Sequence, residues 1–179
     1  MKESLELFNN QAITFASHGE YPEAIACFKK ALQFEQGNHL LWFNMGVTYR
    51  DAGDFDSAKS ALEQALVLSQ KNGETGEAEM EVLAQMLFAN GNLLEAFDYC
   101  AKGVEINMHN SHLWNIMGVI LFNMSEYEDA ATAFEEAVSN DPYYYDALYN
   151  LRDTYSELGN EEGQRACEMT LSEISKKDL

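Results

Sequence analysis

The chain has 179 residues, 46% of them apolar, so it can bury a full core as one ordinary domain or one short repeat array. Eleven basic and thirty acidic side chains give a net charge of -19, which argues against binding to nucleic acid or to anionic membrane surfaces. No apolar run approaches the roughly 20 residues that a membrane-spanning helix needs, so we expect no membrane insertion.

Apolar residues recur at helical spacing along the chain, and the pattern repeats every 34 residues. The expected units are 5–38, 39–72, 77–110, 111–144 and 145–178, with residues 73–76 inserted between the second and third. Each unit contains two apolar-striped segments separated by a turn. We expect four turn glycines to adopt the left-handed conformation that ends a helix: Gly19, Gly53, Gly91 and Gly159.

The second and fourth units share residues that lie 72 positions apart. Trp42, Met45 and Gly46 in the second unit correspond to Trp114, Met117 and Gly118 in the fourth. A glycine inside a helix costs about 1 kcal/mol relative to alanine, so its recurrence needs a structural reason. We therefore predict that these glycines, and the small residue Ala84 in the third unit, let the first helix of a unit approach its neighbour closely.

The stretches LWFNMGVTYRDAGDFDSA and LWNIMGVILFNMSEYEDAATAFEEA resemble the tetratricopeptide repeat (TPR) family, and the resemblance extends over essentially the whole chain. The sequence departs from the family pattern at Arg152, where a small residue is expected, and has the terminal proline only at Pro142. The resemblance implies an all-α fold, an α-solenoid of about five stacked antiparallel helix pairs in a TPR-like superhelix. Residues 1–179 would then form a single repeat domain, and the polar last unit would act as a C-terminal cap.

The cysteines and histidines give little indication of catalytic or metal chemistry. Cys27, Cys100 and Cys167 form no CxxC motif and lie in apolar helical segments, so we expect buried, reduced thiols. His109 and His112 could share a metal, but no thiol or arranged carboxylate accompanies them, and we interpret them as loop residues. We therefore expect no metal, no cofactor and no enzymatic activity. The sequence begins without the apolar core of a secretion signal, so we expect a cytoplasmic protein.

The resemblance to tetratricopeptide repeats also implies a concave groove lined by the first helix of each pair. Asn44 and Asn150 lie where members of the family often use an asparagine to hold the backbone of a ligand. Mapped onto this sequence, the expected peptide-binding groove contains Asn9, Phe43, Asn44, Val47, Arg50, Glu81, Gln85, Phe88, Asn115, Val119, Phe122, Tyr149 and Asn150.

Four of these groove residues are aromatic, and two interpretations of them remain open. Phe43, Phe88, Phe122 and Tyr149 would form an exposed apolar channel for a ligand. Alternatively, the same rings would pack against neighbouring repeats and belong to the core.

Charge and groove composition indicate the chemistry of the expected partner. Residues 1–72 have six basic and nine acidic side chains, whereas residues 73–179 have five and twenty-one. Glu81 and Asp153 add acidic groups near the groove, so we expect a protein or peptide ligand that is apolar with some basic residues. The alternative is that the acidic residues only form a solvated surface. Chaperone adaptors of this family clamp an acidic C-terminal tail with basic residues, but here Arg50 is the lone candidate, which disfavours such a ligand.

The sequence thus predicts a protein–protein interaction scaffold or adaptor that binds a peptide or helix in its concave groove. The alternative is a self-assembling, homo-oligomeric structural TPR protein. Phe8, Phe15 and Tyr21 motivate that alternative, because no repeat precedes the first unit in this sequence to cover them.

Overall fold

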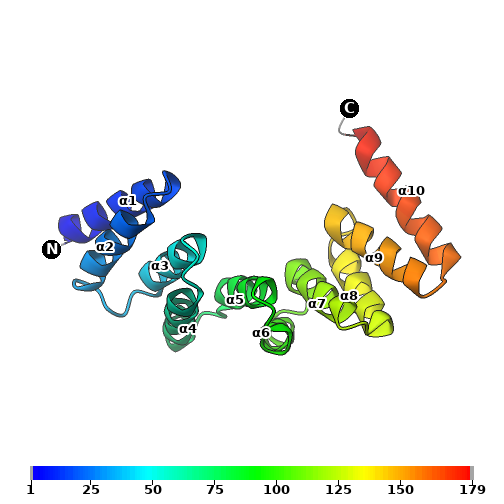
Figure 1. Cartoon of the computed structure of the whole chain (residues 1–179), viewed down its shortest axis with the longest axis horizontal. Helices are drawn as coiled ribbons and strands as arrows, with labels where there is room; N and C mark the ends of the chain where they lie inside the picture. Colours follow the sequence, from blue (N-terminus) through cyan, green and yellow to red (C-terminus); the bar gives the residue numbers. More distant parts are fainter. Residues whose placement is uncertain (1, 178–179) are drawn as a thin grey trace. The chain divides into compact units, whose positions relative to one another are not determined.

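The computed structural model describes residues 2–177 and is all-α within that range (Figure 1). Its helices form consecutive pairs joined by short turns, so the predicted all-α architecture of helix pairs is confirmed. Within residues 2–177, no helix combines the length and apolar content needed to cross a bilayer. The helices are α1 (Lys2–Ser17), α2 (Tyr21–Leu32), α3 (His39–Asp51), α4 (Phe55–Lys71), α5 (Glu77–Ala89), α6 (Leu93–Ile106), α7 (Ser111–Asn123), α8 (Tyr127–Asn140), α9 (Tyr145–Glu157) and α10 (Glu161–Lys177).

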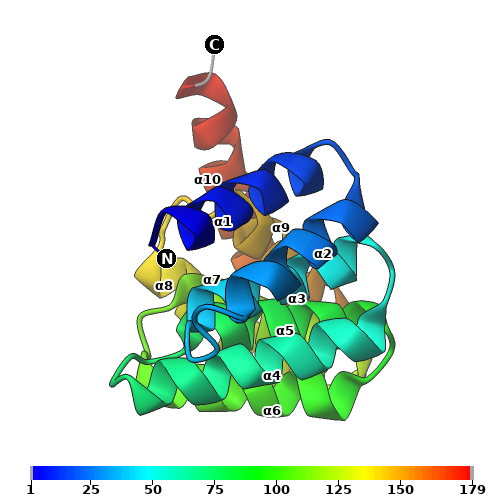
Figure 2. The same cartoon turned by 90° about the vertical axis from the view of Figure 1, so that its left-hand side faces the viewer.

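The chain divides into two compact units, Met1–Met86 and Leu87–Leu179, with the boundary inside α5. In the first unit, α1 packs against α2, α3 packs against α4, and α2 also contacts α3 (Figure 2). In the second unit, α7 packs against α8 and α9 against α10, while α6 contacts α7 and α8 contacts α9. The expected repeat 145–178 ends one residue beyond the described part of the chain.

Local signals in the sequence explain where the helices begin and end. The Asn38 side chain accepts a hydrogen bond from the Leu41 N–H at 3.3 Å and so caps the start of α3. At the other end of α3, Gly53 has a φ of 80°, which a residue without a Cβ adopts at little cost. All four turn glycines predicted to be left-handed have positive φ. Ser125, with a φ of 63°, takes this conformation in the turn between α7 and α8.

Each unit has its own apolar core. In the first, Phe28 of α2 is 1% exposed and lies in a cluster with Leu41 and Met45 of α3. In the second, Phe134 of α8 is equally buried and clusters with Leu151 of α9 and Cys167 of α10. All three cysteines are buried, as the sequence predicts.

The two recurring glycines lie where helices of a pair approach closely. A Cβ atom added to Gly46 of α3 would lie 2.7 Å from Cγ of Leu62 on α4. The same atom on Gly118 of α7 would lie 2.6 Å from Cδ1 of the buried Phe134 ring on α8. Real Cβ atoms are not found at such distances, so the close approach predicted from the sequence is confirmed at Gly46 and Gly118.

Candidate functional site

The predicted groove residues are divided between the two compact units. The first unit contains Asn9, Phe43, Asn44, Val47, Arg50, Glu81 and Gln85. The second unit contains Phe88, Asn115, Val119, Phe122, Tyr149 and Asn150. Each unit therefore has its own set of candidate ligand-binding residues.

A cavity of about 170 Å³ opens on the second unit and brings several of these residues together. Its walls come from three consecutive helices, α7, α8 and α9. The lining residues are Val119, Phe122, Asn123, Phe134, Asn150 and Asp153.

Two asparagine amides form a hydrogen-bonded chain beside this cavity. Nδ2 of Asn150 donates to Oδ1 of Asn115 at 3.0 Å, and Nδ2 of Asn115 donates to the Tyr144 hydroxyl at 3.4 Å. Asn115 is 8% exposed, so it supports Asn150 from within the protein. An amide has two N–H donors and one acceptor, so Asn150 retains a donor and an acceptor for a ligand.

A carboxylate completes the polar side of the cavity. Nε and Nη2 of Arg152 donate to Oδ1 of Asp153 at 2.9 and 2.6 Å, and this pairing raises the pKa of the guanidinium above its ordinary value. The guanidinium also lies 3.9 Å from the centre of the Tyr149 ring. Oδ2 of Asp153 has no hydrogen-bond partner among the described residues, and the side chain is 48% exposed. One carboxylate oxygen is thus left for a ligand at the edge of the cavity.

The four aromatic residues of the predicted groove differ in exposure. Tyr149 is 43% exposed, whereas Phe43, Phe88 and Phe122 are half-buried. The Phe122 ring contacts the Tyr127 ring edge-on, with 5.2 Å between the centroids. Part of each phenylalanine side chain is therefore packed against the protein, and the rest is exposed to solvent.

In the first unit, Phe43 lines a second cavity, of about 210 Å³, at the start of α3 and of α5. The His39 ring lies beside it, with Nε2 at 3.2 Å from Oε1 of Glu74 and Nδ1 at 3.4 Å from Oε1 of Glu79. Glu79 is 5% exposed, so the contact with His39 gives this buried carboxylate a polar partner. Through these two contacts, His39 at the start of α3 is linked to Glu74 in the inserted segment 73–76 and to Glu79 in α5.

The remaining predicted residues of the first unit do not gather at one cavity. Asn9 of α1 has a buried Oδ1 without a hydrogen-bond partner among the described residues. Arg50 of α3 pairs with the neighbouring Asp51 at 2.8 Å. Asn44, Val47 and Glu81 are half-buried, and Gln85 is exposed.

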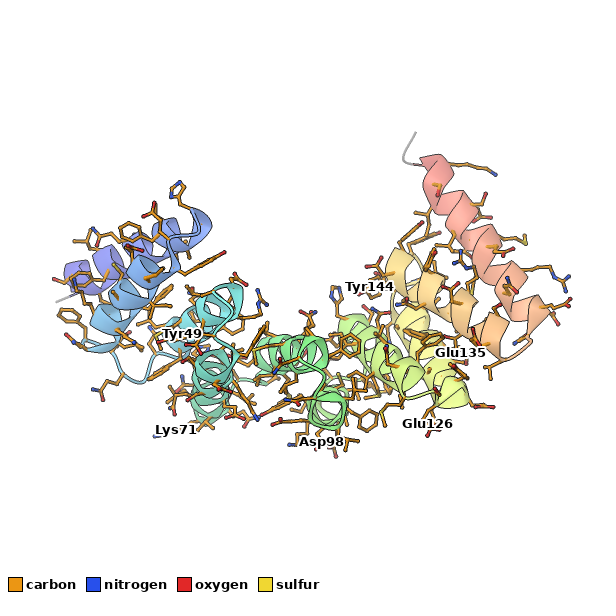
Figure 3. The ribbon with its side chains drawn as sticks, in the orientation of Figure 1. Tyr49, Lys71, Asp98, Glu126, Glu135 and Tyr144 are labelled. Atoms are coloured by element: carbon orange, nitrogen blue, oxygen red, sulfur yellow. The ribbon has the colours of Figure 1, made fainter. Side chains whose placement is uncertain are left out.

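The two histidines considered as metal ligands have other neighbours. Nδ1 of His109 lies 2.8 Å from Oδ1 of Asn140, and the His112 ring stacks on Tyr144 with 5.1 Å between centroids. Figure 3 shows Tyr144 at the start of α9. Within the described residues, no group of three or more histidine, cysteine or acidic side chains is placed to hold a metal ion.

Sequence reasoning did not identify Asn123 or Tyr144 as part of the site. Tyr144 belongs to the run Pro142–Tyr145, whose three successive tyrosines are an unusual feature that could have indicated it. Asn123 has no such signal, because its place at the cavity depends on how α7 packs against α9. Arg152 departs from the repeat pattern, but nothing in the sequence indicates its contact with Tyr149.

A half-buried tyrosine, Tyr155 of α9, packs against the core of the second unit. The Tyr155 hydroxyl donates to Oε1 of Glu135 at 2.7 Å (Glu135 is labelled in Figure 3). Burial, and secondly this hydrogen bond, raise the pKa of Tyr155 above its ordinary value. Burial likewise raises the pKa of the nearby Cys167 thiol. Both groups therefore favour their protonated, neutral forms in the folded protein.

Tyr155 should make the stability of the protein sensitive to alkali. Its pKa is higher in the folded than in the unfolded chain, so its contribution is complete below about pH 10 and is lost as the pH rises further. The urea midpoint should thus fall more between about pH 8 and pH 11 in the wild type than in Tyr155→Phe. Tyr145→Phe, which alters an exposed tyrosine, is the control and should behave as the wild type. An equal fall of the urea midpoint in the wild type and in Tyr155→Phe would contradict the raised pKa of Tyr155.

Comparison with known families identifies the repeat. Sequence models of the family described as "Tetratricopeptide repeat" match residues 15–75 and 117–165, which together exceed half of the chain. A TPR repeat-containing protein of Methanocaldococcus jannaschii is 29% identical over 127 residues, 71% of this chain and 22% of that protein. The BBSome complex member BBS4 of Bos taurus is 25% identical over 130 residues, 73% of this chain and 24% of that protein. The chain thus spans about a quarter or less of the length of these curated relatives.

Solved structures show the same fold at low sequence identity. A crystal structure of MamA protein has a TM-score of 0.82 at 21% identity and covers 99% of this chain and 94% of that chain. MamA from Desulfovibrio magneticus RS-1 has a TM-score of 0.82 at 15% identity and covers 97% of this chain and 96% of that chain. Pseudomonas aeruginosa pilF has a TM-score of 0.80 at 12% identity and covers 97% of this chain and 77% of that chain.

Proposed function

Because the chain belongs to the tetratricopeptide repeat family, we propose that it is a non-enzymatic protein-interaction scaffold whose second unit binds a segment of a partner protein. One observation carries the proposal: apolar, amide and carboxylate groups of α7 and α9 converge on a single cavity. Val119 and Phe122 supply the apolar walls, Asn150 the amide and Asp153 the carboxylate.

The size of the cavity favours a side chain of a peptide over a small molecule. Pockets for drug-sized molecules have volumes of about 300–1,000 Å³, and this cavity has about 170 Å³. A partner would therefore insert one residue here and extend along the surface on either side. The remaining donor and acceptor of Asn150 suit the peptide backbone, which offers the complementary pair at every residue except proline.

The charge of the second unit favours a basic residue in the partner. Residues 87–179 have five basic and seventeen acidic side chains. At the cavity, the unpaired Oδ2 of Asp153 can accept from a lysine or arginine whose methylene stem packs along Phe122. Attraction of this kind mainly increases the association rate and weakens as salt is added.

Selection from a random peptide library displayed on phage, with the whole chain immobilised, tests the proposal and needs no identified partner. The proposal predicts enrichment of peptides that combine lysine or arginine with a large apolar residue. The same selection on an Asp153→Asn, Asn150→Ala chain is the control. Recovery of no common motif, or of the same peptides on both chains, would contradict it.

Self-association is a second candidate function, and exposed apolar side chains of the first unit favour it. Leu7 and Ile13 of α1 are 53% and 47% exposed, and Phe34, just after α2, is 43% exposed. These apolar side chains would lose water if a second copy covered α1 and the end of α2.

If copies associate through this surface, added salt should strengthen the contact. The net charge of -19 opposes association, and the repulsion is least screened at low ionic strength. Sedimentation velocity at low and high salt should then show a larger oligomer fraction at high salt, reduced by Ile13→Ser. A chain that stays monomeric in both conditions at about tens of micromolar, where an association with a micromolar dissociation constant would be populated, would exclude this candidate.

A further inference from the structure

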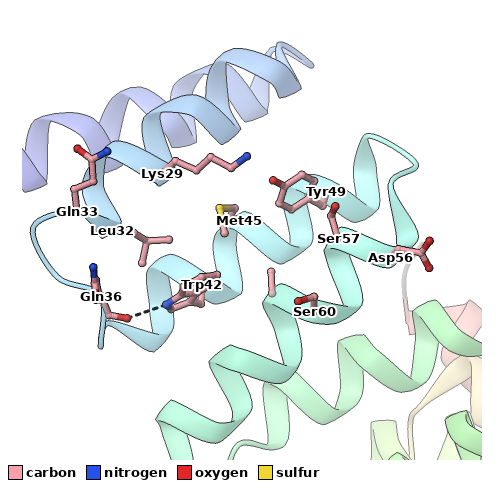
Figure 4. Close-up of a pocket in the computed structure, with 11 residues that line it drawn as sticks. Lys29, Leu32, Gln33, Gln36, Trp42, Met45, Tyr49, Asp56, Ser57 and Ser60 are labelled. Atoms are coloured by element: carbon pink, nitrogen blue, oxygen red, sulfur yellow. Dashed lines mark hydrogen bonds between the residues drawn. The ribbon is translucent and has the colours of Figure 1, made fainter.

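The first unit contains a larger cavity that the groove prediction did not include. It has a volume of about 620 Å³ and is bordered by α2, α3 and α4 (Figure 4). This volume lies within the range of about 300–1,000 Å³ that is typical of small-molecule sites. All of its lining residues belong to residues 29–61, so the first unit forms the cavity alone.

The floor of the cavity is one face of α3. Trp42, Met45 and Tyr49 line it at spacings of three and four residues, which places their side chains on the same side of the helix. Phe43 and Val47, predicted for the peptide groove, lie about 100° and 140° around the helix from Trp42 and so face elsewhere. From Trp42 to Tyr49 the helix rises about 10 Å, which gives the apolar floor its length.

Both ends of this floor are held in place by other contacts. Nε1 of Trp42 donates to the Gln36 carbonyl at 2.9 Å, so the indole already has its partner and presents an apolar ring. At the other end, the Lys29 ammonium lies 5.8 Å from the centre of the Tyr49 ring. Figure 4 shows the Lys29 side chain extending toward Tyr49 and the Asp56 carboxylate directed away from Lys29.

Polar side chains line both ends of the cavity: Gln33 and Gln36 lie toward Trp42, whereas the charged side chains Lys29 and Asp56 lie toward Tyr49 (Figure 4). Ser57 and Ser60 of α4 offer hydroxyl groups across the cavity from Lys29 on α2. Lys29 supplies the positive charge at this end of the floor. An apolar floor of limited length with one cationic end is complementary to an apolar molecule with one anionic end.

We propose that this cavity binds an elongated, apolar small molecule that carries a single anionic group. The apolar body lies along Trp42, Met45 and Tyr49, and the anion lies at Lys29. The protein's overall negative charge opposes anions at long range, so the apolar contact supplies most of the affinity and Lys29 sets the orientation. The site uses a different face of α3 from the predicted groove, so it does not depend on the proposed peptide binding.

Two fluorescent probes that share an anilinonaphthalene body test both parts of the proposal. One is 8-anilinonaphthalene-1-sulfonate, which is anionic, and the other is N-phenyl-1-naphthylamine, which is neutral. Trp114→Phe leaves Trp42 as the one tryptophan, so energy transfer reports a probe bound beside it. Both probes should quench Trp42, with dissociation constants in the micromolar range.

Two substitutions separate the roles of the floor and of the charge. Ser60→Phe, at an exposed rim position, should fill the cavity and abolish transfer from Trp42 to either probe. Lys29→Gln should weaken the sulfonate probe about threefold, as expected for one exposed ion pair, and leave the neutral probe unchanged. Circular dichroism establishes that each variant is folded, and Lys29→Gln keeps the test decisive if Ser60→Phe does not fold.

Matched substitutions in the second unit serve as controls. Thr132→Phe alters the exposed residue that corresponds to Ser60 in the repeat, and Lys102→Gln removes a lysine that lies 5.5 Å from the centre of the Tyr99 ring. Neither should change either dissociation constant. The proposal is overturned if no transfer from Trp42 is seen at saturating probe, or if the two control variants reduce binding as much as Ser60→Phe and Lys29→Gln do. Equal effects of Lys29→Gln on both probes would overturn the anionic part.

Discussion

Replacing Gly118 with leucine is expected to destabilise the second unit by about 3 kcal/mol or more, because the new side chain cannot fit against Phe134. Even a Cβ atom at this position would lie 2.6 Å from the ring, and the ring is 1% exposed and enclosed by its neighbours. The gain in helix propensity on replacing glycine is about 1 kcal/mol, which does not offset the steric overlap of the new side chain with Phe134. Urea unfolding followed by far-UV circular dichroism measures the loss.

The control for this substitution is Gly37→Ala. Gly37 has no positive φ, and a Cβ atom there would meet nothing within 4 Å. Its replacement should change the free energy of unfolding by no more than about 0.5 kcal/mol. A Gly118→Leu variant that unfolds at the same urea concentration as the wild type would show that α7 and α8 are not packed as described.

Truncating Phe122 to alanine is expected to weaken binding of a selected peptide by tenfold or more. The ring supplies one of the apolar walls of the cavity between α7 and α9, and a loss of about 1.4 kcal/mol corresponds to one factor of ten. Asp153→Asn should act differently, by slowing association of a basic peptide at low salt. Surface plasmon resonance with one selected peptide measures both effects.

Stability must be measured on the same Phe122→Ala protein, because this ring is half-buried. We expect a loss well below the roughly 3–5 kcal/mol that is typical when a core phenylalanine is truncated. Met169→Ala removes a 67% exposed side chain of α10 and is the control for loss of apolar surface. Unchanged affinity for Phe122→Ala, or equal losses for Met169→Ala, would show that peptides bind elsewhere.

Much of the fold could be predicted from the sequence because each helix pair depends on local signals. The turn glycine Gly53 and the helical glycine Gly118 each have one structural role that the residue type itself reveals: positive φ in the first case and close approach in the second. Their recurrence at a fixed period indicates the helix pairs without reference to any long-range contact. The division into two compact units was not anticipated, because nothing in the local pattern of α5 marks a boundary.

The candidate site was predictable only in part, because side-chain contacts between helices are not encoded by spacing within one helix. Asn150 and Asn115 were both expected on the groove face and are hydrogen-bonded to each other, but Asn115 also donates to Tyr144, which lies 29 residues away in the sequence. The pairing of Arg152 with Asp153 and its stacking on Tyr149 likewise require the rotamers of three side chains. The cavity bordered by α2, α3 and α4 was not predicted, because the apolar residues that line it have the spacing of the repeat core.

Nuclear magnetic resonance of the isotopically labelled chain, titrated with one selected peptide, tests the proposed binding face most directly. Side-chain amide groups of Asn123 and Asn150 give their own signals and lie at the cavity, together with Val119 and Asp153. We predict that the largest shift changes occur at these four residues and that Asn38, which caps a helix of the first unit, is unaffected. Shift changes that leave Asn123 and Asn150 untouched while the peptide binds would contradict the proposal that this cavity holds the partner.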